Sequence, residues 1–226
     1  MIVLFNLLWG ALFVIVNFVL LVGCYRWFGK KGLFAWISLA TLLANLQVLK
    51  TIELAGNVAT LGNTIYLTIY MATDMLNEKY GEREARSAVW LGFFALLSAT
   101  VTMQMALVFQ PQPEDVAQGH LEALFGFLPQ LALASLSAFL VSQFLDVKIF
   151  SWLKRKYQDK FWIRTNGSTL ISQLVDTLVF CTIAFATMYP FEIWLQIFIS
   201  TYLLKLLLSI LSTPVMYWMR SLKVRE

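Results

Sequence analysis

The chain has 226 residues, of which 59% are hydrophobic and 13% are charged, and its mean hydropathy is +0.72. Soluble domains contain roughly 45 to 50% apolar and about 25% charged residues, so these values exclude an ordinary soluble protein. The net charge of +4 does not require a nucleic-acid partner, because the placement of basic residues along the chain accounts for it. Apolar segments leave no room for a separate aqueous domain, so we expect residues 1–226 to form one integral membrane domain.

Apolar stretches long enough, or nearly so, to cross a hydrocarbon core of about 30 Å follow one another along the chain. They predict an all-α bundle of about seven transmembrane helices, at residues 2–25, 33–50, 61–78, 87–109, 121–153, 168–189 and 191–219. The second and third stretches are joined by ELAGNVATLGN, whose Gly-Asn steps indicate a broken helix or a folded-in loop.

The positions of Lys and Arg predict the orientation, since basic residues collect in cytoplasmic loops. In an alternation of seven spans, fifteen of the 17 basic residues lie on one side: Arg26, Lys30, Lys31, Lys79, Arg83, Arg86, Lys148, Lys154, Arg155, Lys156, Lys160, Arg164, Arg220, Lys223 and Arg225. The links on the opposite side, 110–120 and around Pro190, contain none. We therefore expect the N-terminus outside and the C-terminus inside.

Residue types needed for several kinds of chemistry are scarce. The cysteines Cys24 and Cys181 are far apart and His120 is the sole histidine, so we expect neither a disulfide nor a metal site, and no cofactor. The sequence contains no G-x-x-x-x-G-K-[ST] motif, which excludes ATP hydrolysis of the P-loop type by this chain.

Charged side chains lie within or beside the apolar stretches, where each costs at least about 2.5 to 3.5 kcal/mol. Asp74, Asn77 and Glu78 follow one another at i, i+3 and i+4, so they share one helix face near the inner end of the third span. Lys50 and Glu53 are spaced by one helical turn and are expected to neutralise each other at the outer end of the second span. We regard Lys50, Glu53 and Glu78 as candidates for coupling or gating.

The fifth and sixth spans contain related motifs, LVSQFLD and LISQLVD, at an offset of 30 residues. In each, Gln and Asp share a helix face: Gln143 with Asp146, and Gln173 with Asp176. Both motifs fall in the inner half, so we expect a polar chamber lined by the third, fifth and sixth spans. Gln donates and accepts hydrogen bonds while ionised Asp only accepts, a combination that suits a heterocyclic base. Lys205, near the middle of the last span, is expected to find an acidic partner.

Structural roles compete with these interpretations. Ser and Gln in membrane helices often only join neighbouring helices by hydrogen bonds. Glu78 could serve simply as an interfacial charge paired with a basic residue. A buried carboxylate costs more than a buried amide, so Asp146 and Asp176 favour a functional role more strongly than Gln143 and Gln173 do.

The stretch YMATDMLNEKYGEREAR resembles the signature of the queuosine precursor transporter family, within the vitamin-uptake-transporter-like proteins. Asn45 with Lys50, the segment STLISQLVDT and Lys205 are further matches, and the likeness covers roughly residues 33–219. The resemblance implies import of 7-cyano-7-deazaguanine or its aminomethyl relative, precursors of queuosine in transfer RNA. It also implies a multi-pass location in a bacterial plasma (inner) membrane and a fold similar to substrate-binding subunits of energy-coupling-factor transporters.

With this resemblance, the candidate substrate-binding residues are Asn45, Asp74, Asn77, Gln143, Asp146, Gln173, Asp176 and Lys205. The expected partners are a nucleobase-like small molecule and the lipid bilayer. A compact bundle is also compatible with a homodimer, although no residue requires one. Energy coupling stays open between facilitated uptake, proton coupling through Asp74 or Asp146, and capture of substrate for partner ATPases.

Two alternatives come from other functional classes. An integral membrane enzyme acting on lipid-linked substrates, of the CDP-alcohol phosphotransferase type, needs a dense aspartate cluster around D-G-x-x-A-R. Here Asp74, Asp146 and Asp176 lie on different spans. A purely scaffolding membrane protein predicts instead that Asp176→Ala and Gln143→Ala are tolerated.

Overall fold

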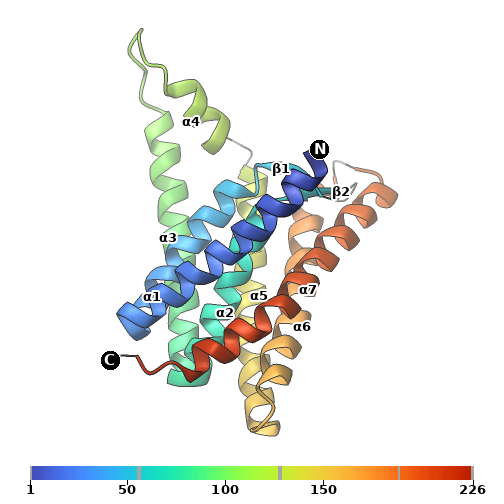
Figure 1. Ribbon diagram of the computed structural model, residues 1–226. Coiled ribbons are helices and arrows are strands. Elements are labelled where there is room, and N and C mark those ends of the chain that lie inside the picture. Colours follow the sequence, from blue (N-terminus) through green and yellow to red (C-terminus); the bar gives the residue numbers. More distant parts are fainter. Residues whose placement is uncertain (1, 55–56, 127–128, 188, 225–226) are drawn as a thin grey trace.

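A computed structural model describes residues 2–54, 57–126, 129–187 and 189–224. The elements in chain order are α1 (Ile2–Gln47), β1 (Thr51–Leu54), β2 (Asn57–Thr60), α2 (Gly62–Tyr80), α3 (Glu82–Leu107), α4 (Gln118–Phe125), α5 (Pro129–Lys156), α6 (Phe161–Phe185) and α7 (Phe191–Ser221). Long helices form a bundle, and the two short strands lie at one end of it (Figure 1). The prediction of an all-α membrane bundle is confirmed.

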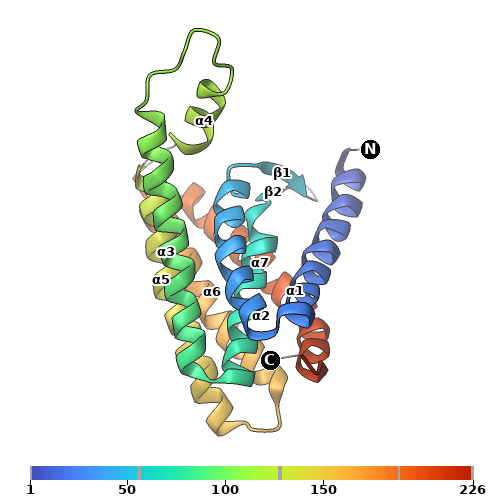
Figure 2. The same ribbon diagram turned by 90° about the vertical axis from the view of Figure 1, so that its left-hand side faces the viewer.

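Gly29 divides α1 into two limbs. Its φ of 56° and ψ of −134° are not helical, and L side chains are strained at positive φ. The chain reverses at this point, so that the two limbs meet in the lower half of Figure 2 and separate toward its top. The first two predicted spans therefore correspond to the two limbs of α1.

We expect Gly29→Ala to destabilise the protein by about 1 to 2 kcal/mol, because a Cβ atom is unfavourable at positive φ. Gly23→Ala is the matched control, since a Cβ at Gly23 has no neighbour within 4 Å and Ala favours the helix. Thermal unfolding in detergent should show a lower midpoint for Gly29→Ala alone. Equal midpoints for the two variants would contradict this role of Gly29.

Five of the described helices are long and apolar enough to cross a membrane: α1, α3, α5, α6 and α7. α2 is more polar, and its side chains from Leu67 to Asn77 are buried. It packs against α1, α3, α5 and α7, near the centre of the bundle. Polar side chains on α2 therefore face protein, where ionisable groups in membrane helices are usually found.

The boundaries of two predicted spans are wrong. The predicted span 121–153 combines α4, which ends at Phe125, with α5, which begins at Pro129. The predicted span 168–189 omits the first two turns of α6, which begins at Phe161. These turns contain Arg164, a polar residue that hydropathy assigns to a loop but that is only 2% exposed here.

The link between α1 and α2 contains an antiparallel hairpin, which the sequence analysis did not predict. Thr51 pairs with Thr60 and Ile52 with Ala59. Three of these residues, Thr51, Ile52 and Thr60, are β-branched and favour extended strands. Because α1 ends at Gln47, Lys50 and Glu53 are not one helical turn apart, and that prediction is wrong. Lys50 is exposed, whereas the side chain of Glu53 lies outside the described part of the chain.

The α2–α3 turn, the α5–α6 link and the C-terminus lie at one end of the bundle (Figure 1). Most basic residues belong to the segments beside these points and beside the bend of α1, and we call this end the basic end. At this end Gly81, with φ of 94°, forms the tight turn between α2 and α3. Lys30 forms an ion pair of 2.7 Å with Glu84 close to that turn. The clustering of basic residues that the sequence analysis used to predict orientation is therefore present in three dimensions.

Candidate functional site

A cavity of about 440 Å³ lies between α1, α2, α5, α6 and α7, in the half of the bundle away from the basic end. This volume is within the usual range for small-molecule sites. Polar and aromatic side chains line it, among them Asn45, Asn63, Tyr66, Phe180 and Phe185, together with Asp176 and Lys205. Three of the predicted substrate-binding residues, Asn45, Asp176 and Lys205, therefore meet at one cavity.

The Asp176 carboxylate is the most extensively bonded group of this cavity. Lys205 Nζ donates to Oδ2 at 2.6 Å, while Tyr66 Oη and Ser142 Oγ donate to Oδ1 at 2.7 and 2.9 Å. Asp176 is 3% exposed and Lys205 is 6% exposed. Lys205 Nζ also lies 3.3 Å from Thr177 Oγ1 and 5.3 Å from the centroid of the Tyr66 ring. The prediction that Lys205 has an acidic partner is confirmed.

The two Ser-Gln-x-x-Asp motifs bond to each other reciprocally. Ser142 of α5 donates to Asp176 of α6, and Ser172 of α6 donates to Asp146 of α5 at 2.7 Å. Within each motif the serine precedes the aspartate by one helical turn. Because α5 and α6 run in opposite directions, the serine of each helix lies opposite the aspartate of the other helix. The two aspartates therefore have equivalent positions, related by an approximate twofold axis between the helices.

Asp146 has different surroundings from Asp176 despite this symmetry. It is fully buried and faces Asp74 of α2, which is 1% exposed and accepts a hydrogen bond from Thr165. We call Asp74 and Asp146 the carboxyl pair. Neither residue is among those that line the cavity described above.

The glutamines of the two motifs are also buried, at 0% exposure for Gln143 and 1% for Gln173. Gln143 Oε1 accepts a hydrogen bond of 3.4 Å from Thr73 of α2. Neither glutamine lines the cavity, and neither does the carboxyl pair. The predicted single chamber is therefore divided in the described structure, with Asp176 at the cavity and the other members of the two motifs packed between helices.

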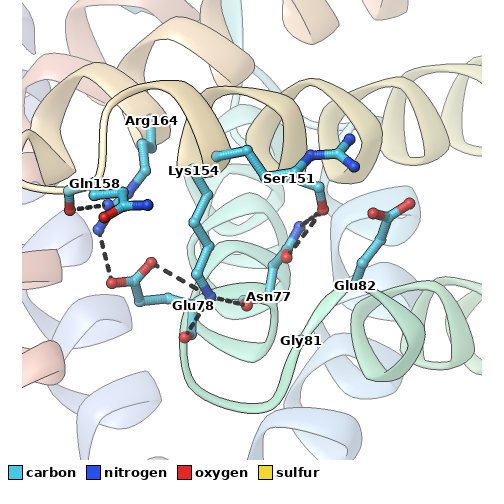
Figure 3. Close-up of a pocket in the computed structure, with 9 residues that line it drawn as sticks. Asn77, Glu78, Gly81, Glu82, Ser151, Lys154, Gln158 and Arg164 are labelled. Atoms are coloured by element: carbon cyan, nitrogen blue, oxygen red, sulfur yellow. Dashed lines mark hydrogen bonds and ion pairs between the residues drawn. The ribbon is translucent and has the colours of Figure 1, made fainter.

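Asn77 and Glu78 lie at the basic end and line a second cavity of about 470 Å³ (Figure 3). Asn77 Nδ2 donates to the Val147 carbonyl at 3.0 Å and to Ser151 Oγ at 2.9 Å, which ties α2 to α5. Of the residues predicted to share a helix face, Asp74 thus belongs to the carboxyl pair, while Asn77 and Glu78 lie closer to the end of the bundle.

Glu78 is surrounded by basic groups from three other helices. Its carboxylate lies 2.7 Å from Arg164, 3.1 Å from Arg220 and 3.8 Å from Lys154. Lys154 Nζ also donates to the backbone carbonyls of Asn77 and Glu78, at 2.8 and 2.7 Å. These four side chains, which we call the basic-end ion cluster, join α2, α5, α6 and α7. These ion pairs fit the interpretation of Glu78 as an interfacial charge paired with basic residues. The position of the cluster at the end of the bundle is also compatible with the gating role considered for Glu78.

A family model described as "Putative vitamin uptake transporter" matches residues 60–219. The chain belongs to this family. It is 52% identical over 215 residues to the "Probable queuosine precursor transporter" of Bacillus subtilis (strain 168), with 94% of both chains covered. It is 28% identical to the "Queuosine precursor transporter" of Escherichia coli (strain K12), over 83% of this chain and 85% of that one. No solved structure matches significantly. The resemblance derived from sequence motifs is confirmed, and the protein is a multi-pass membrane protein.

One contact of the site, the hydrogen bond that Thr165 donates to Asp74, was not predicted from the sequence. The sequence does contain a signal for a role of Thr165, because it lies on one polar helix face with Ser168, Ser172 and Asp176. Ser142 and Ser172 join α5 to α6 as the helix-linking interpretation predicts, and in each case the acceptor is a buried aspartate. Spacing within one helix could not identify these partners, because they lie on a neighbouring helix.

Four aromatic residues near the polar motifs were expected from the sequence to cover the flat face of a base: Tyr66, Tyr70, Phe144 and Trp162. Tyr66 lines the cavity and packs edge-on against Tyr70, with ring centroids 5.6 Å apart. Phe144 instead packs against Trp90, with ring centroids 5.3 Å apart, and Trp162 is 53% exposed. Phe180 and Phe185 supply the additional aromatic surface of the cavity.

Proposed function

We propose that this protein is a membrane transporter that imports queuosine precursors, 7-cyano-7-deazaguanine or 7-aminomethyl-7-deazaguanine, across the bacterial plasma membrane. The observation that carries the proposal is the buried Asp176–Lys205 pair in the wall of the cavity. The names of the relatives support the choice of substrate.

The chemistry of the cavity matches a 7-deazaguanine. The base presents N1–H and its exocyclic amine side by side, and the Asp176 carboxylate accepts from both. Its carbonyl oxygen needs a donor, which Lys205 or Asn45 supplies. Asp176 already accepts three hydrogen bonds, so the substrate replaces at least one of them. Of the two neutral donors, Tyr66 and Ser142, Tyr66 lines the cavity and is the one that we expect to leave. Phe180 and Phe185 cover the flat face of the base.

The orientation follows from the positive-inside rule, which assigns the basic end to the cytoplasm. The Asp176 cavity then belongs to the outer half, whereas the chamber expected from the sequence was assigned to the inner half. The basic-end ion cluster closes the inner half. This arrangement corresponds to a state that receives substrate from outside. Asn77 and Glu78 act at the inner gate, whereas Lys50 lies at the outer end of α1 beside the hairpin.

The relatives are named transporters, and we extend this assignment by proposing that the chain is not an enzyme. A lipid-phosphotransferase reading needs clustered carboxylates, and no group of three or more metal-ligating side chains occurs among the described residues. One chain builds the whole cavity, so we assign binding to the single bundle. The homodimer stays a prediction, and measuring the molecular mass of the protein in detergent would test it.

Equilibrium binding to the purified protein tests the proposal. Titration calorimetry in detergent should give saturable binding of 7-cyano-7-deazaguanine, and at least about tenfold weaker binding of adenine. Adenine lacks the carbonyl oxygen and the N1–H donor, so it leaves Asp176 and Lys205 without matching groups. Equal affinity for the two bases, or no binding by folded protein, would contradict the proposed substrate.

A further inference from the structure

Among the described residues, two acceptor atoms of the carboxyl pair have no donor. Thr165 donates to Asp74 Oδ2, and Ser172 donates to Asp146 Oδ1 at 2.7 Å. The other oxygens, Asp74 Oδ1 and Asp146 Oδ2, are buried and have no hydrogen-bond partner within the described residues. Contacts between α2 and α5 on either side of the pair, from Thr73 to Gln143 and from Asn77 to the Val147 carbonyl, place the two aspartates side by side. Two ionised carboxylates have no hydrogen to share.

In the part of the chain that the structure describes, the carboxyl pair also lacks a direct counter-ion. At the equivalent position of the twofold arrangement, Asp176 has Lys205 at 2.6 Å. None of the ion pairs of 4.0 Å or less between described residues includes Asp74 or Asp146. Toward the basic end, Glu78 of α2 pairs with Lys154 of α5, Arg164 of α6 and Arg220 of α7. Toward the cavity, Asp176 accepts hydrogen bonds from Tyr66 and Lys205, and the buried Tyr70 hydroxyl has no hydrogen-bond partner among the described residues.

Two adjacent carboxylates in a water-poor interior cannot both stay ionised without a compensating cation. A single proton bound by the pair removes this repulsion and supplies a donor. The remaining negative charge is stabilised by the hydroxyl groups of Thr165 and Ser172. One bound proton thus satisfies the atoms that the protein itself leaves without a partner.

We propose that Asp74 and Asp146 form a proton-binding site that couples substrate import to proton entry. This inference rests on the proposed function and adds its driving force. The carboxyl pair lies between the Asp176 cavity and the basic-end ion cluster, so a proton bound there enters from the outer side and leaves toward the cytoplasm. The proton is carried through, and no covalent bond other than O–H forms or breaks.

The structure provides a direct link between the proton and the substrate. Ser172 and Asp176 lie one turn apart on α6, and Ser172 is bonded to Asp146 while Asp176 faces the cavity. Ser142 makes the corresponding link from α5 to Asp176. A displacement of α6 or α5 when substrate binds at Asp176 therefore changes the hydrogen bonding of the carboxyl pair.

Transport by the purified protein in liposomes provides the test. Liposomes with an acidic exterior should accumulate labelled 7-cyano-7-deazaguanine about tenfold per pH unit if one proton accompanies each substrate. Unlabelled substrate should acidify the interior, as reported by a trapped pH-sensitive dye. Accumulation driven by a sodium gradient, or uptake indifferent to the pH gradient, would overturn the proposal.

Asp74→Asn and Asp146→Asn remove the titratable group with little change of shape. Each variant should lose accumulation driven by the pH gradient, yet still exchange labelled for unlabelled substrate across the membrane. Asp115→Asn, at an exposed loop, is the matched control and should behave like wild type. Gradient-driven accumulation by both carboxyl-pair variants would overturn the inference.

Substrate exchange separates this inference from the function on which it rests. If folded wild-type protein neither binds nor exchanges the precursor, the proposed function fails and this inference fails with it. If wild type exchanges the precursor but never moves protons with it, only the proton site is refuted. Size-exclusion profiles and unfolding midpoints establish that each variant is folded.

Discussion

Asp176→Asn should lower the initial rate of precursor uptake by about 10- to 100-fold. The carboxylate accepts from both adjacent donors of a deazaguanine, whereas an amide presents one oxygen and a competing NH₂ group. Hydrogen bonds to a charged group contribute about 1.5 to 3 kcal/mol, which corresponds to this range. Uptake of labelled 7-cyano-7-deazaguanine into liposomes, normalised to inserted protein, measures the effect.

A double variant distinguishes lost binding from lost stability. Breaking a buried ion pair by removing one partner costs about 3 to 5 kcal/mol, so Asp176→Asn should also lower the unfolding midpoint because Lys205 is left unpaired. Adding Lys205→Met removes the unpaired charge and should restore much of the stability without restoring uptake. Recovery of uptake together with stability would show that the pair is only structural.

Glu78→Gln should destabilise the protein by about 3 to 5 kcal/mol, since it leaves the buried Arg164 without its carboxylate partner. The side chains of Lys154 and Arg220 are 35% and 39% exposed, so water compensates much of their loss. The same change should open the basic end, because the ion cluster joins α2 to α5, α6 and α7. An introduced cysteine at Ser151, which lines the nearby cavity, should react faster with a thiol reagent.

Glu84→Gln is the matched control for this prediction. Glu84 pairs with Lys30, and the two side chains are 33% and 40% exposed. Such a surface pair is typically worth less than 1 kcal/mol, so its loss should leave both the unfolding midpoint and the Ser151→Cys reaction rate nearly unchanged. A similar response to both substitutions would contradict the role of Glu78 as a closing contact.

Much of the fold could be predicted because hydropathy reports which segments can face lipid. The predicted start of α6 was wrong for the same reason, because hydropathy assigns a charged residue such as Arg164 to a loop. Arg164 is buried in the helix because it pairs with Glu78, and the sequence does not show that partner. The β1–β2 hairpin was missed because Gly-Asn steps indicate a break in a helix but do not specify what replaces it.

The candidate site was predictable in its composition more than in its arrangement. Helical spacing places Asp74, Asn77 and Glu78 on one face, but it does not show that they occupy different depths with different partners. Lys205 was expected to need a carboxylate, yet the choice of Asp176 depends on how α6 packs against α7. The reciprocal serine–aspartate bonds likewise depend on the register between α5 and α6.

Uptake of labelled 7-cyano-7-deazaguanine into liposomes that contain only this purified protein tests the central claim most directly. We predict saturable uptake without any partner ATPase, and competition by the unlabelled precursor. Binding without uptake would mean that the chain is a substrate-capturing subunit that needs a motor. Neither binding nor uptake, in protein shown to be folded, would contradict its assignment as a queuosine precursor transporter.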